Sequence, residues 1–172
     1  MDMGMLQVYT GDGKGTTTAA VGLAVRARSR ELKVLFAQFM KETPGGEPEA
    51  LRDMAGVDIM RFLDIGSPLF NKFLTPAELR EESLRAIERL RQIIAGYDLV
   101  ILDEFIHLLR PGVLTEQEAG EFIKGRPQGV ELVLTGRGAP GWLIEMADLV
   151  TEMKDVKHPA SKGLKASKGI EY

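Results

Sequence analysis

The chain has little of the side-chain chemistry on which many enzymes depend. Its 172 residues include no cysteine and only 2 histidines. The absence of cysteine excludes disulfides, thiolate nucleophiles and cysteine-ligated zinc, and it fits a reducing compartment. Two histidines and no thiol also leave little material for acid–base or covalent catalysis.

The chain also lacks a large charge excess and a long apolar run. Its net charge of −3 gives no reason to expect general affinity for nucleic acid. No uncharged run approaches the roughly 20 apolar residues of a membrane helix, and the opening residues MDMGM carry no signal-peptide pattern. We therefore expect a cytoplasmic protein with no membrane partner, folded as one domain over residues 1–172.

Apolar, β-rich runs alternate along the chain with segments of helical periodicity. Strands are predicted at Leu6–Tyr9, Val34–Phe39, Val57–Leu63, Leu99–Leu102, Glu131–Thr135 and Leu149–Met153. Helices are predicted at Thr17–Arg28, Pro76–Ala95, Thr115–Ile123 and Pro140–Ala147. This alternation predicts an α/β fold with a mostly parallel central sheet of about six strands flanked by helices. The stretches Lys41–Pro48 and Gly66–Leu74, and the tail 154–172, are predicted to be irregular.

The stretch YTGDGKGTTT, which starts at Tyr9, joins the first predicted strand to the first predicted helix. Its alternating glycines let the backbone fold tightly with N–H groups pointing at an anion, beside the positive end of the helix dipole. Compared with the phosphate-loop pattern G-x-x-x-x-G-K-[ST], Thr10 replaces the first glycine and Thr16 replaces the lysine. Taken alone, the stretch is also compatible with a glycine-rich turn that binds nothing.

Two further segments point to the same edge of the predicted sheet. The strand Leu99–Leu102 runs into Asp103 and Glu104, and a P-loop protein holds Mg²⁺ with a carboxylate at such a strand end. The TGRG stretch after Glu131–Thr135 would bring Arg137 to this edge, and arginine suits a polyphosphate. Solvated acids and an exposed arginine are the competing interpretation, but the loop and the acidic strand end together indicate a nucleotide site.

These segments resemble one family. The matching stretches are YTGDGKG from residue 9, LDE from 102, GRP from 125, LTGRG from 134, VKHP from 156, GLKA from 163 and KGIEY from 168. In this order, from about Leu6 to Tyr172, they resemble the ATP:corrinoid adenosyltransferases of cobalamin biosynthesis. The tail is the most specific part, because general P-loop enzymes do not carry it.

The resemblance implies a RecA-like P-loop NTPase fold and a defined reaction. The enzyme would transfer the 5′-deoxyadenosyl group of ATP to the cobalt of a reduced corrinoid, cob(I)yrinic acid a,c-diamide or cob(I)alamin, and release triphosphate. ATP, Mg²⁺ and a corrinoid are the implied ligands. A homodimer is the implied assembly, and an electron-donating flavoprotein is an implied partner.

The resemblance also assigns roles by position. The implied nucleotide contacts are Gly11, Asp12, Gly13, Lys14, Gly15, Thr16, Thr17, Thr18, Arg26 and Arg137. Thr17 and Glu104 are the implied Mg²⁺ ligands, with Asp103 beside them. Phe70 and Phe73 are the implied corrinoid contacts, with core packing as the competing interpretation, and His107 is expected on the surface or in packing rather than as a ligand.

The loop departs from the family's usual G-[ND]-G-K-G-K-T-T at Thr16, which stands in place of the second lysine. Threonine donates a hydrogen bond but carries no charge, so reduced ATP affinity or turnover is our hypothesis, with Lys14 as the remaining loop cation. Two other functions stay open. A P-loop kinase or NTPase is disfavoured by the missing lysine and by the tail, whereas a family member that only binds nucleotide or corrinoid is favoured by Thr16.

Overall fold

The computed structural model describes residues 4–40, 46–63 and 74–159, together with residues 163, 167, 169 and 170. Six strands form one sheet in the order β3-β2-β4-β5-β1-β6, and every pairing is parallel. The strands are β1 (Leu6–Thr10), β2 (Val34–Phe39), β3 (Val57–Phe62), β4 (Leu99–Asp103), β5 (Glu131–Thr135) and β6 (Leu149–Glu152). The α/β class and the parallel central sheet predicted from the sequence are confirmed.

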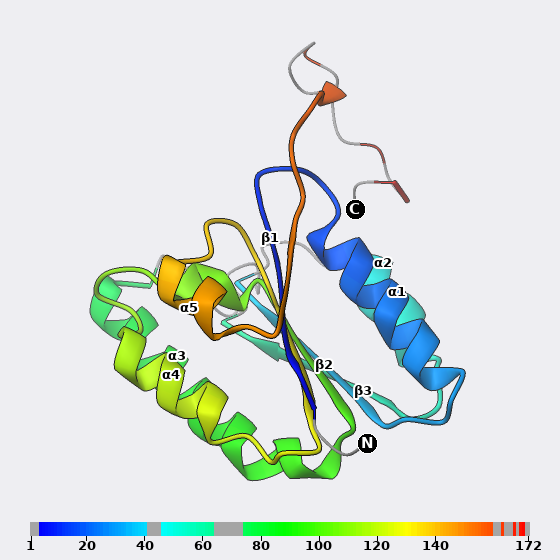
Figure 1. The fold of residues 1–172 in the computed structure, drawn as a ribbon, viewed down its shortest axis with the longest axis horizontal. Helices are drawn as coiled ribbons and strands as arrows, with labels where there is room; N and C mark the ends of the chain where they lie inside the picture. The colour runs from blue at the N-terminus through cyan, green and yellow to red at the C-terminus, as the bar shows by residue number, and fades with distance from the viewer. Residues whose placement is uncertain are drawn as a thin grey trace.

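Helices cover both faces of the sheet (Figure 1). The helices are α1 (Thr16–Arg28) and α2 (Gly46–Arg52) on one face, and α3 (Pro76–Ile93), α4 (Glu116–Lys124) and α5 (Gly141–Met146) on the other. The chain crosses the sheet in one direction from β1 to β3 and in the opposite direction from β3 to β6. Because crossovers between parallel strands are right-handed, this reversal moves the later helices to the opposite face.

The core has a layer on each side of the sheet. Beneath α1, the small buried residues Ala20, Ala24 and Ala27 pack against strand residues that include Phe36 and Ile101. The other layer lies beneath α3, α4 and α5 and contains the ring contacts Phe39–Phe105 and Phe105–Phe122, with centroids 5.5 and 6.0 Å apart. Burying one such side chain contributes about 1.5–3 kcal/mol, so these layers hold the helices against the sheet.

The helix boundaries differ from prediction where the last turn tightens. The helix predicted at Pro76–Ala95 ends at Ile93 and continues as the 3₁₀ helix η2 (Ile94–Gly96). A second 3₁₀ helix, η3 (Phe105–Leu108), follows β4 directly. Such short 3₁₀ turns are common at helix ends and in connections.

One prediction of irregular structure was wrong. The stretch Lys41–Pro48 was expected to be irregular, but α2 begins at Gly46. Glycine and proline suggested a loop, whereas Pro48 lies in the first helical turn, where its missing N–H costs little, and Leu51 buries the helix against the core. Residues 41–45 and 64–73 lie outside the described part of the chain, and with them Phe70, Phe73 and most of the stretch Gly66–Leu74.

Candidate nucleotide site

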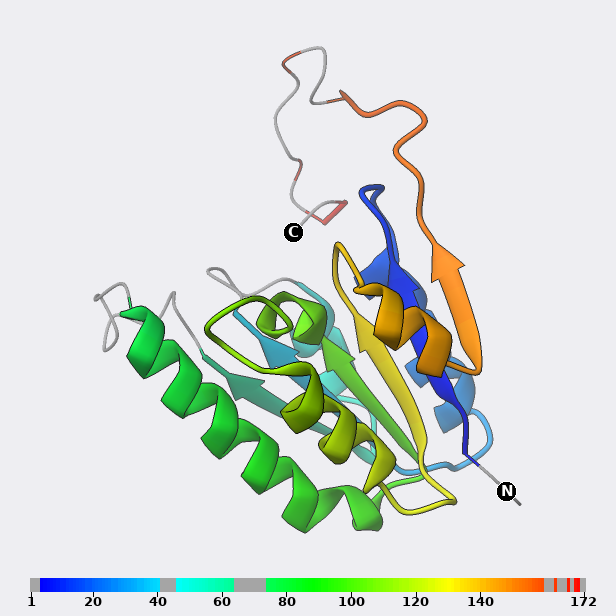
Figure 2. The same ribbon diagram turned by 60° about the vertical axis from the view of Figure 1, so that its left-hand side comes forward.

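The carboxyl ends of all six strands meet at one edge of the sheet, because every pairing is parallel. Figure 2 shows the loop after β1, the loop after β5 and the chain leaving β6 at this same end of the molecule. Open parallel sheets bind ligands at this edge. The segments that the sequence singled out are therefore neighbours in space.

A row of buried polar side chains closes the core at this edge. Gln38 on β2, Asp103 on β4 and Thr135 on β5 are 1%, 0% and 0% exposed. Two positions earlier, the same strands carry the apolar residues Phe36, Ile101 and Val133 that pack beneath α1. Because side chains alternate along a strand, the polar residues share the face on which α1 lies. We call Gln38, Asp103 and Thr135 the polar row.

Asp103 is the centre of the polar row. The Thr17 hydroxyl, from the first turn of α1, donates to Asp103 Oδ1 at 2.8 Å. The Thr135 hydroxyl donates to the same oxygen at 2.7 Å, and Gln38 Nε2 donates to Oδ2 at 3.0 Å. Three donors compensate the burial of this carboxyl group, which would otherwise be costly. Asp103, predicted beside the metal ligands, is the acid that contacts Thr17.

Glu104 adopts a strained backbone conformation beside Asp103. Its φ of 62° lies in the left-handed region, and its N–H donates to the Thr135 hydroxyl at 3.0 Å. Its carboxylate Oε2 lies 2.7 Å from His107 Nε2, which gives His107 a contact at the site that sequence reasoning missed. Left-handed non-glycine residues cluster at functional sites, and here Thr135 and His107 hold the geometry.

The amino end of α1 differs from those of α3 and α4. Capping boxes formed by Thr75 with Glu78 and by Thr115 with Glu118 satisfy the amide groups of α3 and α4. The N-cap of α1 is Gly15, which provides no side-chain cap, and its first turn contains no acidic residue. Unsatisfied amides and the helix dipole favour an anion at such an end.

Gly11 and Gly13 pack against the backbone of Met153 and Lys154, which leaves no room for a side chain at either glycine. The sequence did not predict this contact. The Gly13 N–H donates to the Met153 carbonyl at 2.7 Å, and the Met153 N–H donates to the Thr10 carbonyl at 2.7 Å. A Cβ on Gly11 would lie 2.3 Å from the Met153 carbonyl oxygen, and one on Gly13 would lie 2.7 Å from the Lys154 carbonyl oxygen. The loop is thus packed against the chain that follows β6, in addition to any contact with an anion.

Thr10, which stands where the usual pattern has glycine, joins two loops. Its hydroxyl accepts a hydrogen bond from the Ala139 N–H at 3.1 Å, and the Gly136 N–H donates to the Tyr9 carbonyl at 3.2 Å. These bonds fix the loop after β5 beside the end of β1. Arg137 lies in this loop with an exposed side chain, at the edge where the sequence placed it.

The family model described as ATP:corrinoid adenosyltransferase BtuR/CobO/CobP matches residues 2–172. The chain belongs to this family. Three relatives named corrinoid adenosyltransferase match nearly the whole chain. The protein of Escherichia coli (strain K12) is 33% identical over 178 residues, covering 99% of this chain and 87% of the relative. The Sinorhizobium sp protein is 34% identical over 177 residues, covering 99% and 81%, and that of Pseudomonas aeruginosa is 33% identical over 177 residues, covering 99% and 85%.

The predicted contacts of this ATP:corrinoid adenosyltransferase family member do not all lie together. Lys14 Nζ donates to the carbonyl of Ile170 in the tail at 2.8 Å, so the loop cation contacts the family-specific tail. Thr16 is the first residue of α1 and is half-buried, whereas Asp12 and Thr18 are exposed. Arg26 lies in the last turn of α1, ten residues beyond Thr16 and therefore about 15 Å further along the helix axis. The structure does not bring Arg26 to the loop.

The polar row also shows what sequence reasoning missed. Gln38 and Thr135 were read as strand residues, yet both contact the acid that holds Thr17. The available signal was a polar residue at the end of an otherwise apolar strand, which sequence reasoning applied only to the acidic pair Asp103 and Glu104. Among the described residues, no helix is both long enough and apolar enough to cross a membrane.

Proposed function

We propose that this chain transfers the 5′-deoxyadenosyl group of ATP to the cobalt of a reduced corrinoid and releases triphosphate. The observation that carries the proposal is the hydrogen bond between Thr17, at the uncapped start of α1, and buried Asp103, in a chain of the ATP:corrinoid adenosyltransferase family. This pairing joins the glycine-rich loop to the acidic strand end, as a triphosphate–cation site requires.

The residues at the site fit Mg²⁺, a hard cation that takes oxygen ligands. The Thr17 hydroxyl and the carboxylates of Asp103 and Glu104 are the oxygens that would hold it, and buried Gln38 Oε1 adds an acceptor that has no hydrogen-bond partner among the described residues. When bound, the cation supplies positive charge that neutralises the developing negative charge of triphosphate.

The chain's own residues bind and orient the nucleotide. Gly11–Thr18 and the amino end of α1 offer amide groups to the triphosphate, and Arg137 adds an exposed positive charge at the same edge. In the reaction, an electron pair on cobalt(I) forms the Co–C5′ bond while the C5′–O bond breaks and its pair leaves on triphosphate. No proton moves, so no general base is required, which suits a chain with two histidines and no cysteine.

The proposal also covers the corrinoid contacts, the assembly, the cellular location and the electron donor. Phe70 and Phe73 are proposed to contact the corrinoid. A homodimer, a cytoplasmic location and reduction of the corrinoid by a flavoprotein are proposed with them. Both cob(I)yrinic acid a,c-diamide and cob(I)alamin are candidate acceptors.

The experiment is an anaerobic assay with MgATP and chemically reduced cob(I)alamin or cob(I)yrinic acid a,c-diamide. We expect the absorbance change of Co–C bond formation, with intact triphosphate as the second product. Asp103→Asn should lower turnover by about 10–100-fold, as expected for a residue that orients a cation site. The matched control is Asp98→Asn, just before the other end of β4, where the carboxylate accepts from the Lys33 N–H. ADP and orthophosphate as the products would instead indicate an NTPase, and ADP with the phosphoryl group on an acceptor would indicate a kinase.

A second function is favoured by one residue. Thr16 replaces the lysine that the loop usually carries, so a chain that binds nucleotide or corrinoid without turnover is the alternative proposal. Binding of MgATP without any adenosylated corrinoid would support it.

A further inference from the structure

Gln38 is a buried residue of the polar row whose side-chain amide has a hydrogen-bond partner for its nitrogen but, among the described residues, none for its oxygen. Its Nε2 donates to Asp103 Oδ2 at 3.0 Å, and its side chain is 1% exposed. Its Oε1 has no hydrogen-bond partner among the described residues. A buried polar atom without a partner is unusual in a folded protein, and it calls for a ligand or an ordered water.

The orientation of this amide is fixed by its neighbour. A carboxylate oxygen accepts hydrogen bonds, so the NH₂ group must face Asp103 and the oxygen must point elsewhere. Arg61 is the register partner of Gln38 on β3, yet it does not donate to Oε1. Exchanging the two amide atoms would break the bond to Asp103.

The chemistry of Oε1 selects the class of ligand. An amide oxygen only accepts, and so do the oxygens of a triphosphate, so the nucleotide's phosphates cannot satisfy it. Water molecules bound to a divalent cation are donors, and Mg²⁺ in proteins keeps several of them. Gln38 shares Asp103 with Thr17, so its oxygen belongs to the end of the site where a cation would bind.

We propose that Gln38 is a cation-binding residue of this site: its Oε1 accepts a hydrogen bond from a water of a hydrated divalent cation, while its Nε2 holds Asp103. The inference rests on the proposed function and adds a residue to the nucleotide site. It assigns Gln38 to the cation rather than to the triphosphate, so loss of its oxygen affects ATP binding only when the cation is present.

The test measures the dissociation constant of ATP by titration of the full-length protein, once with saturating Mg²⁺ and once with EDTA. The readout is the ratio of the EDTA value to the Mg²⁺ value. Gln38→Met keeps the length of the side chain but removes both the acceptor and the Nε2 donor to Asp103, and it should lower this ratio by about three- to tenfold. A purely structural role would weaken both values equally and leave the ratio at the wild-type level, which would overturn the proposal.

A second variant keeps the test decisive if Gln38→Met does not fold. Gln38→Glu loses the donor to Asp103 but retains an acceptor and places a second carboxylate beside Asp103. The added negative charge should favour the cation, repel cation-free ATP and raise the ratio. A ratio at or below the wild-type value would contradict the proposal. Gln7→Met is the matched control, because Gln7 is also a buried strand glutamine whose amide donates to a carboxylate, that of Glu131, and it should leave the ratio unchanged.

The wild-type protein separates this inference from the proposed function. If it adenosylates a corrinoid while neither Gln38 variant changes the ratio, the inference fails and the proposed function stands. If it binds no MgATP, both fail.

Discussion

At the scale of single residues, the glycine-rich loop has Thr16 where the family usually has lysine, and its remaining lysine, Lys14, contacts the tail. Thr16 begins α1 directly after the N-cap residue Gly15, which has no side chain to cap the helix. Lys14, the lysine of this loop, donates to the Ile170 carbonyl at 2.8 Å. A triphosphate bound at the start of α1 would therefore meet a hydroxyl at residue 16 where the family usually presents an ammonium group.

Restoring that charge should strengthen nucleotide binding. We expect Thr16→Lys to lower the dissociation constant of MgATP by about tenfold, because an ammonium group adds charge attraction to the hydrogen bond that the threonine hydroxyl can already donate to triphosphate. Titration of wild type and variant under the same salt conditions measures the change. Val25→Lys, which adds the same charge at an exposed position later in α1, is the control and should change the constant little. Equal constants for wild type and Thr16→Lys would refute the hypothesis that the missing lysine limits ATP affinity.

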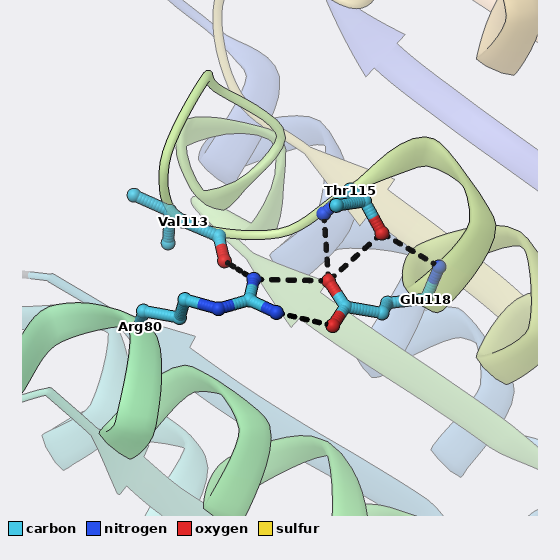
Figure 3. A network of polar contacts seen from close by, with 4 residues as sticks. All are labelled: Arg80, Val113, Thr115 and Glu118. Atoms are coloured by element: carbon cyan, nitrogen blue, oxygen red, sulfur yellow. Dashed lines mark hydrogen bonds and ion pairs between the residues drawn. The ribbon is translucent and has the colours of Figure 1, made fainter. Parts of the chain in front are cut away.

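At the scale of elements, one acidic residue caps a helix and ties it to another. Figure 3 shows Glu118 of α4 bound by the Arg80 guanidinium of α3 and by Thr115, the N-cap of α4. Arg80 Nη2 lies 2.6 Å from Glu118 Oε1, and Nη1 also donates to the Val113 carbonyl. These bonds, that from Arg80 first and those from Thr115 second, lower the pKa of Glu118 to about 2.

This shift predicts how stability depends on acid. Because the pKa is lower in the folded state, the carboxylate's contribution is present above its unfolded pKa of about 4.3 and is lost as the pH falls towards about 2. Glu118→Gln removes this titration, so its free energy of unfolding should fall less steeply than that of wild type between about pH 4.5 and pH 2. Denaturant unfolding at a series of pH values measures both slopes. Glu121→Gln, at an exposed position on the same helix, should follow wild type; parallel slopes for Glu118→Gln and wild type would show that the pair does not stabilise the fold.

At the scale of the whole molecule, the glycine-rich loop contacts segments that come late in the sequence. β6 lies at the edge of the sheet, pairs with β1 and leads into Met153 and Lys154, which pack against Gly11 and Gly13. The same loop contacts Ile170 through Lys14. Residues from the first and last parts of the sequence thus meet at this loop, among them Ile170 of the tail.

A methyl group at Gly13 should separate these two segments. Gly13 is not one of the glycines with a positive φ, but an alanine Cβ there would lie 2.7 Å from the Lys154 carbonyl atoms. We expect Gly13→Ala to lower the free energy of unfolding by about 1–3 kcal/mol, as for other overpacked sites, and to speed hydrogen exchange of the Met153 amide. Denaturant unfolding and amide exchange measure these effects.

The matched control for this prediction is Gly22→Ala. Gly22 lies in the interior of α1, and a Cβ there would meet no atom within 4 Å apart from its chain neighbours and the nearby backbone of α1, so alanine should stabilise the helix by about 0.5–1 kcal/mol. A Gly13→Ala protein as stable as wild type, with unchanged exchange at Met153, would show that the close contact with the chain after β6 is not maintained in solution.

The sequence by itself determined the elements and the local signals within them. Strand and helix periodicity, the Thr75–Glu78 capping box and the glycine-rich loop before α1 depend on residues a few positions apart, so they could be read from the chain directly. The acidic end of β4 was visible for the same reason. Gly46 and Pro48 misled because the burial of Leu51, which holds α2 in place, depends on distant neighbours.

Only the tertiary structure decided which of these residues meet. Thr17 and Asp103 are 86 positions apart, and their bond depends on the order β2-β4-β5-β1 and on the register that aligns the strand ends. The same register brings Gln38 and Thr135 to Asp103 and places Met153 against the loop glycines. Local periodicity carries no information about strand order, so the choice of Asp103 rather than Glu104 as the partner of Thr17 had to come from the folded sheet.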